Sequence, residues 1–193
     1  MALPLVATAQ NSWERIEKQT STNTSQKYLA GAVPEVDGRV VFETTIKAPN
    51  LTADQIYDRL LDLLTQLTKT SNQLEQSRIT IADKDKHEIV ANYQEWLVFK
   101  STALVLDRTR LLYTLMADCR DGEATVKMTR IVYIYDEERN PTTYKAEEWI
   151  NDKYGLNKKQ TKLSRVSGKF RSKTIDRKDY LFEKLQEFMN TSK

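Results

Sequence analysis

Four side chains with the chemistry of metal ligands stand close together in the first half of the chain. They are Asp83, Asp85, His87 and Glu88. Carboxylate and imidazole groups bind many divalent metals, but sites of this type usually draw on more than one histidine or cysteine. Lysines alternate with these acids and dilute their charge, and His87 is the only histidine of the chain. The stretch is therefore interpreted as a polar turn between strands, and the sequence predicts no metal site.

Cys119 is the next candidate for chemistry, because it is the only cysteine. A nucleophilic cysteine needs a base beside it, and only His87 could serve as a histidine base. A single cysteine also excludes an internal disulfide bond. The chain has no G-x-S-x-G or H-E-x-x-H motif, and its five glycines disfavour a phosphate-cradling loop. The sequence therefore predicts no catalytic residues and no cofactor.

A basic stretch in the last quarter of the chain is the clearest charge anomaly. Residues 153–178 hold one acid, Asp176, and ten basic side chains, which gives a local net charge of +9. The basic residues are Lys153, Lys158, Lys159, Lys162, Arg165, Lys169, Arg171, Lys173, Arg177 and Lys178. A flexible basic arm could hold phosphate, anionic lipid headgroups, acidic glycan or nucleic acid, and its candidate binding residues are Lys169, Arg171 and Lys173. The alternative is a solvated loop with ordinary surface lysines, and no interleaved aromatic residues support nucleic-acid stacking.

A second candidate site follows from polar side chains that alternate along three expected strands, over residues 88–100, 107–118 and 124–135. Side chains two apart share a face of a sheet. One face therefore collects Gln94, Trp96, Arg110, Thr114, Lys127, Thr129 and Tyr133. A tryptophan and a tyrosine beside amide and cationic groups would suit a sugar or a peptide. The alternative is that the N-terminal leader, or residues 144–154, cover this face.

The expected domain opens with a strand over residues 39–47, which Gly38 precedes and Pro49 ends. Thr52 and Gln55 have the spacing of a capping box, which marks the start of a helix. Apolar residues at helical spacing give this helix one buried face over about 17 residues. They include Ile56, Leu60, Leu63 and Leu67.

A further short strand over residues 78–82 precedes the three longer strands, and short connections between the four predict an antiparallel meander. A last helix is expected from about residue 175 to 189. The fold class is therefore α+β, with a five-stranded antiparallel sheet and two helices packed on one face. The opening strand should pair with a strand far from it in sequence, because a crossover helix follows it.

The N-terminus has features of an export signal. Ala7-Thr8-Ala9 has the small-x-small form of a signal-peptidase site and follows an apolar stretch. We expect residues 1–9 to be an export-signal remnant, 10–36 a polar leader and 37–193 a single domain. The expected location is the periplasm or cell envelope. No run of about 18 apolar residues predicts a membrane span.

Several stretches resemble a family of exported bacterial domains of unknown function whose fold is similar to the TATA-box-binding protein. They are residues 33–42 (VPEVDGRVVF), 46–49 (IKAP), 56–57 (IY), 168–176 (GKFRSKTID) and 181–182 (LF). The resemblance implies a TBP-like fold and an exported location. It brings no catalytic set and no binding residues, and likeness to a DNA-binding fold does not imply DNA binding.

The expected function is a non-enzymatic cell-envelope binding or interaction module, for an anionic ligand, a glycan or a protein partner. The sheet face, the basic stretch or both would supply the site. Two alternatives stay open: an enzyme of unrecognised type, and a nucleic-acid-binding domain if the chain is not exported.

Overall fold

The computed structural model describes residues 26–102, 104–135 and 139–191. The expected export signal and most of the expected leader lie outside these residues. The main sheet is antiparallel, with the strand order β3-β7-β6-β5-β4. Its strands are β3 (Phe42–Lys47), β4 (Arg78–Asp83), β5 (Glu88–Ser101), β6 (Leu106–Arg120) and β7 (Glu123–Tyr135). The opening strand β3 pairs with β7, the last strand of the meander, as predicted.

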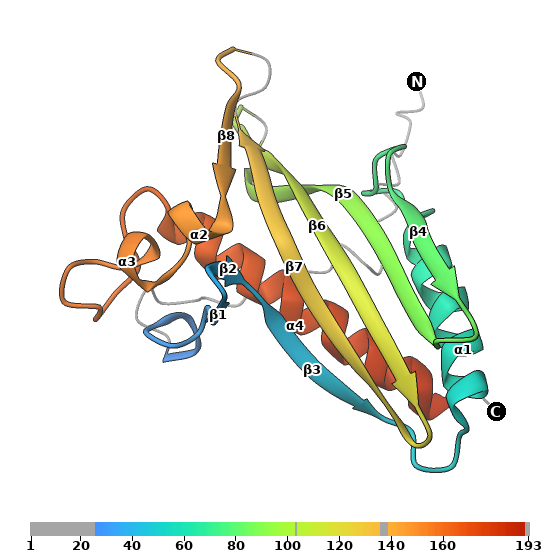
Figure 1. Cartoon of the computed structure of the whole chain (residues 1–193). Helices are drawn as coiled ribbons and strands as arrows, with labels where there is room; N and C mark the ends of the chain where they lie inside the picture. The colour runs from blue at the N-terminus through green and yellow to red at the C-terminus, as the bar shows by residue number, and fades with distance from the viewer. Residues whose placement is uncertain (1–25, 103, 136–138, 192–193) are drawn as a thin grey trace, which may run out of the picture.

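A sixth strand, β8 (Thr142–Lys145), pairs with the end of β7 and was not predicted. Its four residues are too few to show an alternation, so residues 144–154 were expected to be a short helix or an irregular segment. The smaller elements are η1 (Gln26–Tyr28), β1 (Glu35–Val36), β2 (Arg39–Val40), α2 (Ala146–Trp149) and α3 (Asp152–Gly155). They lie near the end of β8, from which the chain continues into α2 (Figure 1).

The helix α1 (Ala53–Leu67) begins at the predicted capping box. The Thr52 hydroxyl accepts from the backbone N–H of Gln55, and the Gln55 side chain accepts from the backbone N–H of Thr52. These two hydrogen bonds satisfy donors that the first turn of a helix leaves without a partner. The predicted leucine stripe is buried against the sheet.

The helix α4 (Gly168–Thr191) starts earlier than the expected residue 175. The Ser164 hydroxyl accepts from the backbone N–H groups of Ser167 and Gly168, which stabilises the first turn. The basic residues from 169 to 173 were expected in a flexible arm, or alternatively in a solvated loop, ahead of the helix. They are instead part of α4, whose inner side faces the sheet, so the expectation of a flexible basic arm is wrong for these residues.

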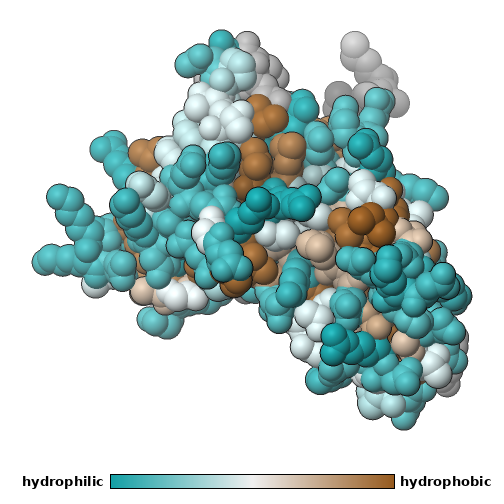
Figure 2. All heavy atoms as spheres, in the orientation of Figure 1, coloured by the Kyte–Doolittle hydropathy of each residue, from teal (hydrophilic) through white to brown (hydrophobic). Residues whose placement is uncertain are grey.

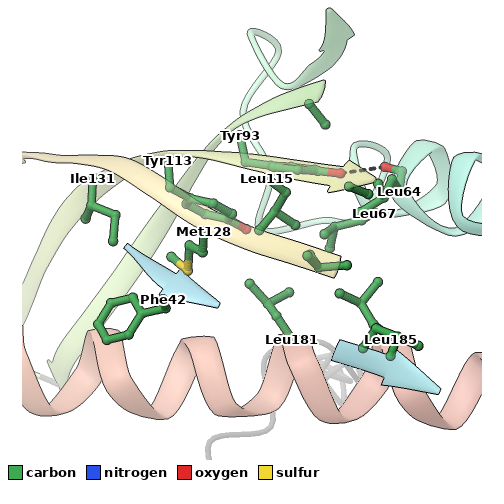
Figure 3. Close-up of a cluster of buried hydrophobic side chains, with 14 of the residues drawn as sticks. Phe42, Leu64, Leu67, Tyr93, Tyr113, Leu115, Met128, Ile131, Leu181 and Leu185 are labelled. Atoms are coloured by element: carbon green, nitrogen blue, oxygen red, sulfur yellow. Dashed lines mark hydrogen bonds between the residues drawn. The ribbon is translucent and has the colours of Figure 1, made fainter. Parts of the chain in front are cut away.

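Both long helices pack on the same face of the sheet and lie behind it in Figure 1. Figure 3 shows the core between them, where side chains of the strands point toward Leu181 and Leu185 of α4. The hydroxyl of Tyr93 donates to the carbonyl of Leu64, which ties β5 to α1 at 2.9 Å. The core also takes in Tyr28 and Val33, so residues that were expected in the leader belong to the packed domain.

A β-bulge at Arg130 changes the face on which the end of β7 places its side chains. Leu112 pairs with Val132 and Thr114 pairs with Thr129, so Arg130 and Ile131 together oppose a single residue of β6. Arg130 has a positive φ of 54°. Because one extra residue reverses the alternation beyond it, Val132 and Ile134 point outward and Tyr133 points inward, the opposite of the expectation.

A buried ion pair joins the middle of α4 to β5. The Arg177 guanidinium donates from Nε to one oxygen of Glu95 at 2.7 Å and from Nη2 to the other at 2.6 Å. The side-chain amides of Asn72 and Gln73 donate to the same carboxylate. Glu95 is 1% exposed and Arg177 6%. The charge of Glu95 raises the pKa of Arg177, although burial alone would lower it. Several hydrogen bonds between the two groups and their neighbours accompany this burial.

Arg171 makes a second buried cluster near the start of α4. Its guanidinium donates to the backbone carbonyls of Tyr28, Leu29 and Ile150, at 2.6, 2.6 and 2.7 Å. It also donates to the carboxylate of Asp152 at 2.7 Å. The side chain is fully buried, and its hydrogen bonds connect segments that are far apart in the sequence. Arg171 is therefore a structural residue and is not placed to contact a ligand.

Substitution of Arg171 by methionine should lower the free energy of unfolding by about 3 kcal/mol or more, because the carbonyls and Asp152 lose a buried charged donor. Urea unfolding measures this change. The matched control is Lys173→Met, because Lys173 is half-buried on the same helix and has no ion pair in the part of the chain described. The control should change stability by less than about 0.5 kcal/mol. Equal effects of the two substitutions would contradict this role of Arg171.

Candidate ligand-binding surfaces

The outward face of the sheet is the side away from α1 and α4. The strand register places Trp96, Arg110 and Ile134 in one row across β5, β6 and β7. The next row holds Gln94, Leu112 and Val132. All six side chains are half-buried. The described helices leave this face open, and Figure 2 shows hydrophobic side chains on it over β6 and β7, with hydrophilic ones around them.

Trp96 is the aromatic centre of this face. The guanidinium of Arg108 lies over its ring, with Cζ 3.7 Å from the ring centroid, and the guanidinium of Arg110 lies at 5.9 Å. A guanidinium stacked on an indole keeps its N–H groups in a plane parallel to the ring, where they can donate to further groups. Arg108 was missed in the sequence, although it lies two residues from Arg110 on the same face.

Gln94, Trp96, Arg110 and Lys127 all lie on the outward face, as their alternation predicted. The structure does not bring all four together. Lys127 lies further along β7 from Trp96 and forms an ion pair with Glu43 at 3.1 Å. Among the described residues, the neighbours of Trp96 across the strands include Arg110 and the aliphatic Ile134, with Arg108 over its ring.

Tyr133 was predicted on this face and is instead fully buried on the helix side. Its hydroxyl lies 2.7 Å from that of Thr174 in α4, and burial raises its pKa. The bulge at Arg130 is the physical reason. The segment 144–154, which could have covered the outward face, also lies on the helix side. There Tyr144 stacks on Trp149 at 3.9 Å, and the Trp149 ring meets Phe170 of α4.

Lys169, also a predicted ligand-binding residue, is bound within the fold. Its ammonium donates to Asp107 at 2.7 Å and to the Tyr135 hydroxyl at 3.0 Å, and it lies 4.6 Å from the centre of the Phe99 ring. Burial alone would lower the pKa of Lys169, and these hydrogen bonds raise it above its ordinary value. Lys173 is half-buried on α4, away from the outward face of the sheet.

Four exposed cations of the basic stretch lie in the loop that connects α3 to α4. Lys158, Lys159, Lys162 and Arg165 are exposed there. Three of them border a surface hollow of about 770 Å³, which Lys169 and Ser172 of α4 also line. This hollow groups exposed cations at the surface of the described residues.

The turn that contains His87 has the polar character that was expected. His87 Nε2 lies 2.9 Å from a carboxylate oxygen of Asp54 at the start of α1, and the His87 backbone has a φ of 54°. Across residues 26–102, 104–135 and 139–191, no three histidine, cysteine, aspartate or glutamate side chains gather as a metal site would need. Among the described helices, none has the length and hydropathy of a membrane span.

Comparison with known proteins gives the family. A family model described as a domain of unknown function (DUF4468) with TBP-like fold matches residues 42–134. The crystal structure of a DUF4468 family protein from Bacteroides ovatus ATCC 8483 is 41% identical, covers 86% of this chain and 95% of its own, and superposes with a TM-score of 0.79. The chain belongs to the DUF4468 family.

The TBP-like fold of this DUF4468 protein has a further structural match. A TBP-like protein from Parabacteroides distasonis ATCC 8503 is 19% identical and superposes with a TM-score of 0.65, over 83% of this chain and 99% of the other. At that identity the match shows the fold alone. The search of the curated proteins gives no match. The family resemblance and the fold class predicted from the sequence are therefore confirmed, and the family's description assigns no activity.

The thiol of Cys119 should react slowly with alkylating reagents in the folded protein. It is buried on β6, and burial together with the charge of Asp118 raises the pKa of its thiol to about 12. At pH 8 the thiolate fraction is then roughly a thousandfold lower than for an ordinary thiol, so alkylation by iodoacetamide should be slower by a similar factor. Mass spectrometry gives the rate, and the same protein in guanidinium chloride is the control. Rapid alkylation of the folded protein would contradict this environment.

Proposed function

We propose that this DUF4468 domain is a non-enzymatic binding module of the cell envelope, and that its ligand lies on the outward face of the sheet around Trp96. The observation that carries the proposal is the arrangement of that face. An indole with a guanidinium stacked on it stands among half-buried apolar side chains, and the described helices do not cover it. Grouped apolar side chains at a surface are typical of binding sites.

The chemistry of the face favours an acidic glycan. An indole surface and the neighbouring Ile134 and Val132 can pack against the C–H groups of a sugar ring. Arg108 and Arg110, which also interact within the protein, bring planar guanidinium groups of the kind that bind carboxylates. Gln94 lies in the next row and adds an amide, which can both donate to and accept from hydroxyl groups. The face therefore has groups that complement the ring, the carboxylate and the hydroxyl groups of a sugar acid.

Two other functions receive less support from the same residues. A surface that binds single-stranded nucleic acid presents several aromatic side chains for successive bases, and the outward face has Trp96 as its aromatic centre. An enzyme that uses a cysteine nucleophile would need a thiol of lowered pKa, and the pKa of Cys119 is raised.

An envelope location is supported by Ala7-Thr8-Ala9, which has the form of a signal-peptidase site after an apolar stretch. Carbohydrates with acidic groups are accessible to proteins outside the cytoplasm. The location and the proposed ligand are therefore compatible, and each can be tested without the other.

The binding site can be tested by NMR with galacturonate trimers, with maltotriose as a neutral probe of similar size. The indole N–H signal of Trp96 should shift on addition of the acidic trimer and shift less with the neutral one. The signal of Trp149 should stay in place, because its ring stacks on Tyr144 on the helix side. Trp96→Ala should weaken binding about tenfold or more, since loss of a stacked ring costs about 1–3 kcal/mol.

Tyr154→Ala is the matched control, because Tyr154, like Trp96, is an aromatic residue beside a cation. Tyr154 is exposed, and the Lys153 ammonium lies 4.8 Å from its ring centre. It lies on α3, away from the outward face, and its loss should leave the affinity within about twofold. Shifts that map to the helix side, or equal losses from both substitutions, would count against the outward face.

The location has its own test. If the chain is exported, the protein recovered from the periplasm or envelope of a Gram-negative host should begin at Gln10, after cleavage at Ala9. N-terminal sequencing of fractionated cells measures this, and a variant with Ala7→Asp and Ala9→Asp should block the cleavage. Recovery of the full-length chain from the cytosol would overturn the envelope location.

A further inference from the structure

We propose that the loop between α3 and α4 is a second binding site, for a phosphate monoester. The site is the hollow of about 770 Å³ that this loop forms with the first turns of α4. It is separate from the outward face of the sheet and does not depend on the function proposed for that face.

The charge of the hollow is the first observation. Its lining residues include Lys158, Lys162, Arg165 and Lys169, and no acidic residue is among them. A neighbouring hollow of about 580 Å³, lined in part by Glu35, Asp152 and Lys153, mixes both signs of charge. The positive potential is therefore local to one hollow, and an anion there would meet cations without a carboxylate beside it.

The state of these cations is the second observation. Lys158, Lys162 and Arg165 have no acidic side chain within 4 Å in the part of the chain that the structure describes. The basic residues further along α4 differ, because Lys169, Arg171 and Arg177 each form an ion pair. The basic stretch thus contains cations that form ion pairs within the fold and cations of the loop that are exposed to solvent.

The loop itself has a defined shape. The side-chain oxygen of Asn157 accepts from the backbone N–H groups of Thr161 and Lys162, at 2.9 and 3.2 Å. The backbone N–H of Asn157 donates to the carbonyl of Lys162 at 3.0 Å, and Leu156 pairs with Leu163 across the base of the loop. A closed loop holds the backbone of its cations in place, which reduces the entropy lost on binding.

The number of cations selects the ligand class. A phosphate monoester carries nearly two negative charges near neutral pH and three acceptor oxygens, which can be shared among two lysines and an arginine. A single carboxylate carries half the charge. The same phosphate chemistry occurs in soluble esters and in anionic lipid headgroups, and the structure favours the group without choosing between the two sources.

Isothermal titration of the full chain with tripolyphosphate, at low and at physiological salt, tests the site. The variant K162E/R165E should weaken binding at least tenfold, because it replaces two of the cations that line the hollow. The matched control is K69E/R78E, which changes the net charge equally at two exposed cations, one just after α1 and one on the edge strand β4, away from the α3–α4 loop. The control should alter the affinity less than threefold.

Co-sedimentation with vesicles that contain phosphatidic acid, whose headgroup is a phosphate monoester, and with phosphatidylcholine vesicles as the reference without net charge, distinguishes the sources. Binding to either tripolyphosphate or phosphatidic acid that K162E/R165E selectively removes supports the site and names its source. Absence of binding to both probes, or equal losses in both variants, overturns it. The Trp96→Ala variant should bind these probes normally, so failure of the outward face and failure of the hollow give different results.

Discussion

The buried ion pair between Glu95 and Arg177 fixes how the two layers of the domain meet. Glu95 interrupts the apolar inner side of β5, and an uncompensated carboxylate at 1% exposure would be strongly destabilising. It is tolerated because α4 places a guanidinium against both of its oxygens and the loop after α1 adds two amides. The pair can form in only one register of helix on sheet, so it specifies which side of α4 faces inward.

This requirement explains why the positive charge of residues 153–178 does not form one surface. On α4, Arg171 and Arg177 donate hydrogen bonds to buried carbonyls and carboxylates, and Lys169 forms an ion pair with Asp107. Lys158, Lys162 and Arg165, which have no ion pair among the described residues, lie before the helix begins, in the loop that borders the hollow. A net charge of +9 counted along the sequence therefore overstates the charge available to a ligand. The location of each partner decides what is available.

Much of the fold could be predicted because its signals are local. The capping box of Thr52 and Gln55, the leucine stripe of α1 and the alternation of β5 and β6 depend on neighbours in the sequence, and each was correct. The errors lie where distant residues decide. Nothing near Arg171 in the sequence reveals the carbonyls of Tyr28 and Leu29 that bury it. Glu95 breaks the apolar alternation of β5, and that was the available sign of a buried partner.

The bulge at Arg130 links the fold to the candidate binding face. With strict alternation, Val132 and Ile134 would be buried and Tyr133 would stand beside Trp96. The extra residue reverses this order, so Tyr133 reaches Thr174 on α4, and the two aliphatic side chains are left on the outward face near Trp96. Leaving aliphatic groups half-exposed costs hydrophobic stabilisation, which the buried hydrogen bond and packing of Tyr133 offset on the other face. One inserted residue thus produces both the aromatic packing against α4 and the apolar surface on which a ligand can lie.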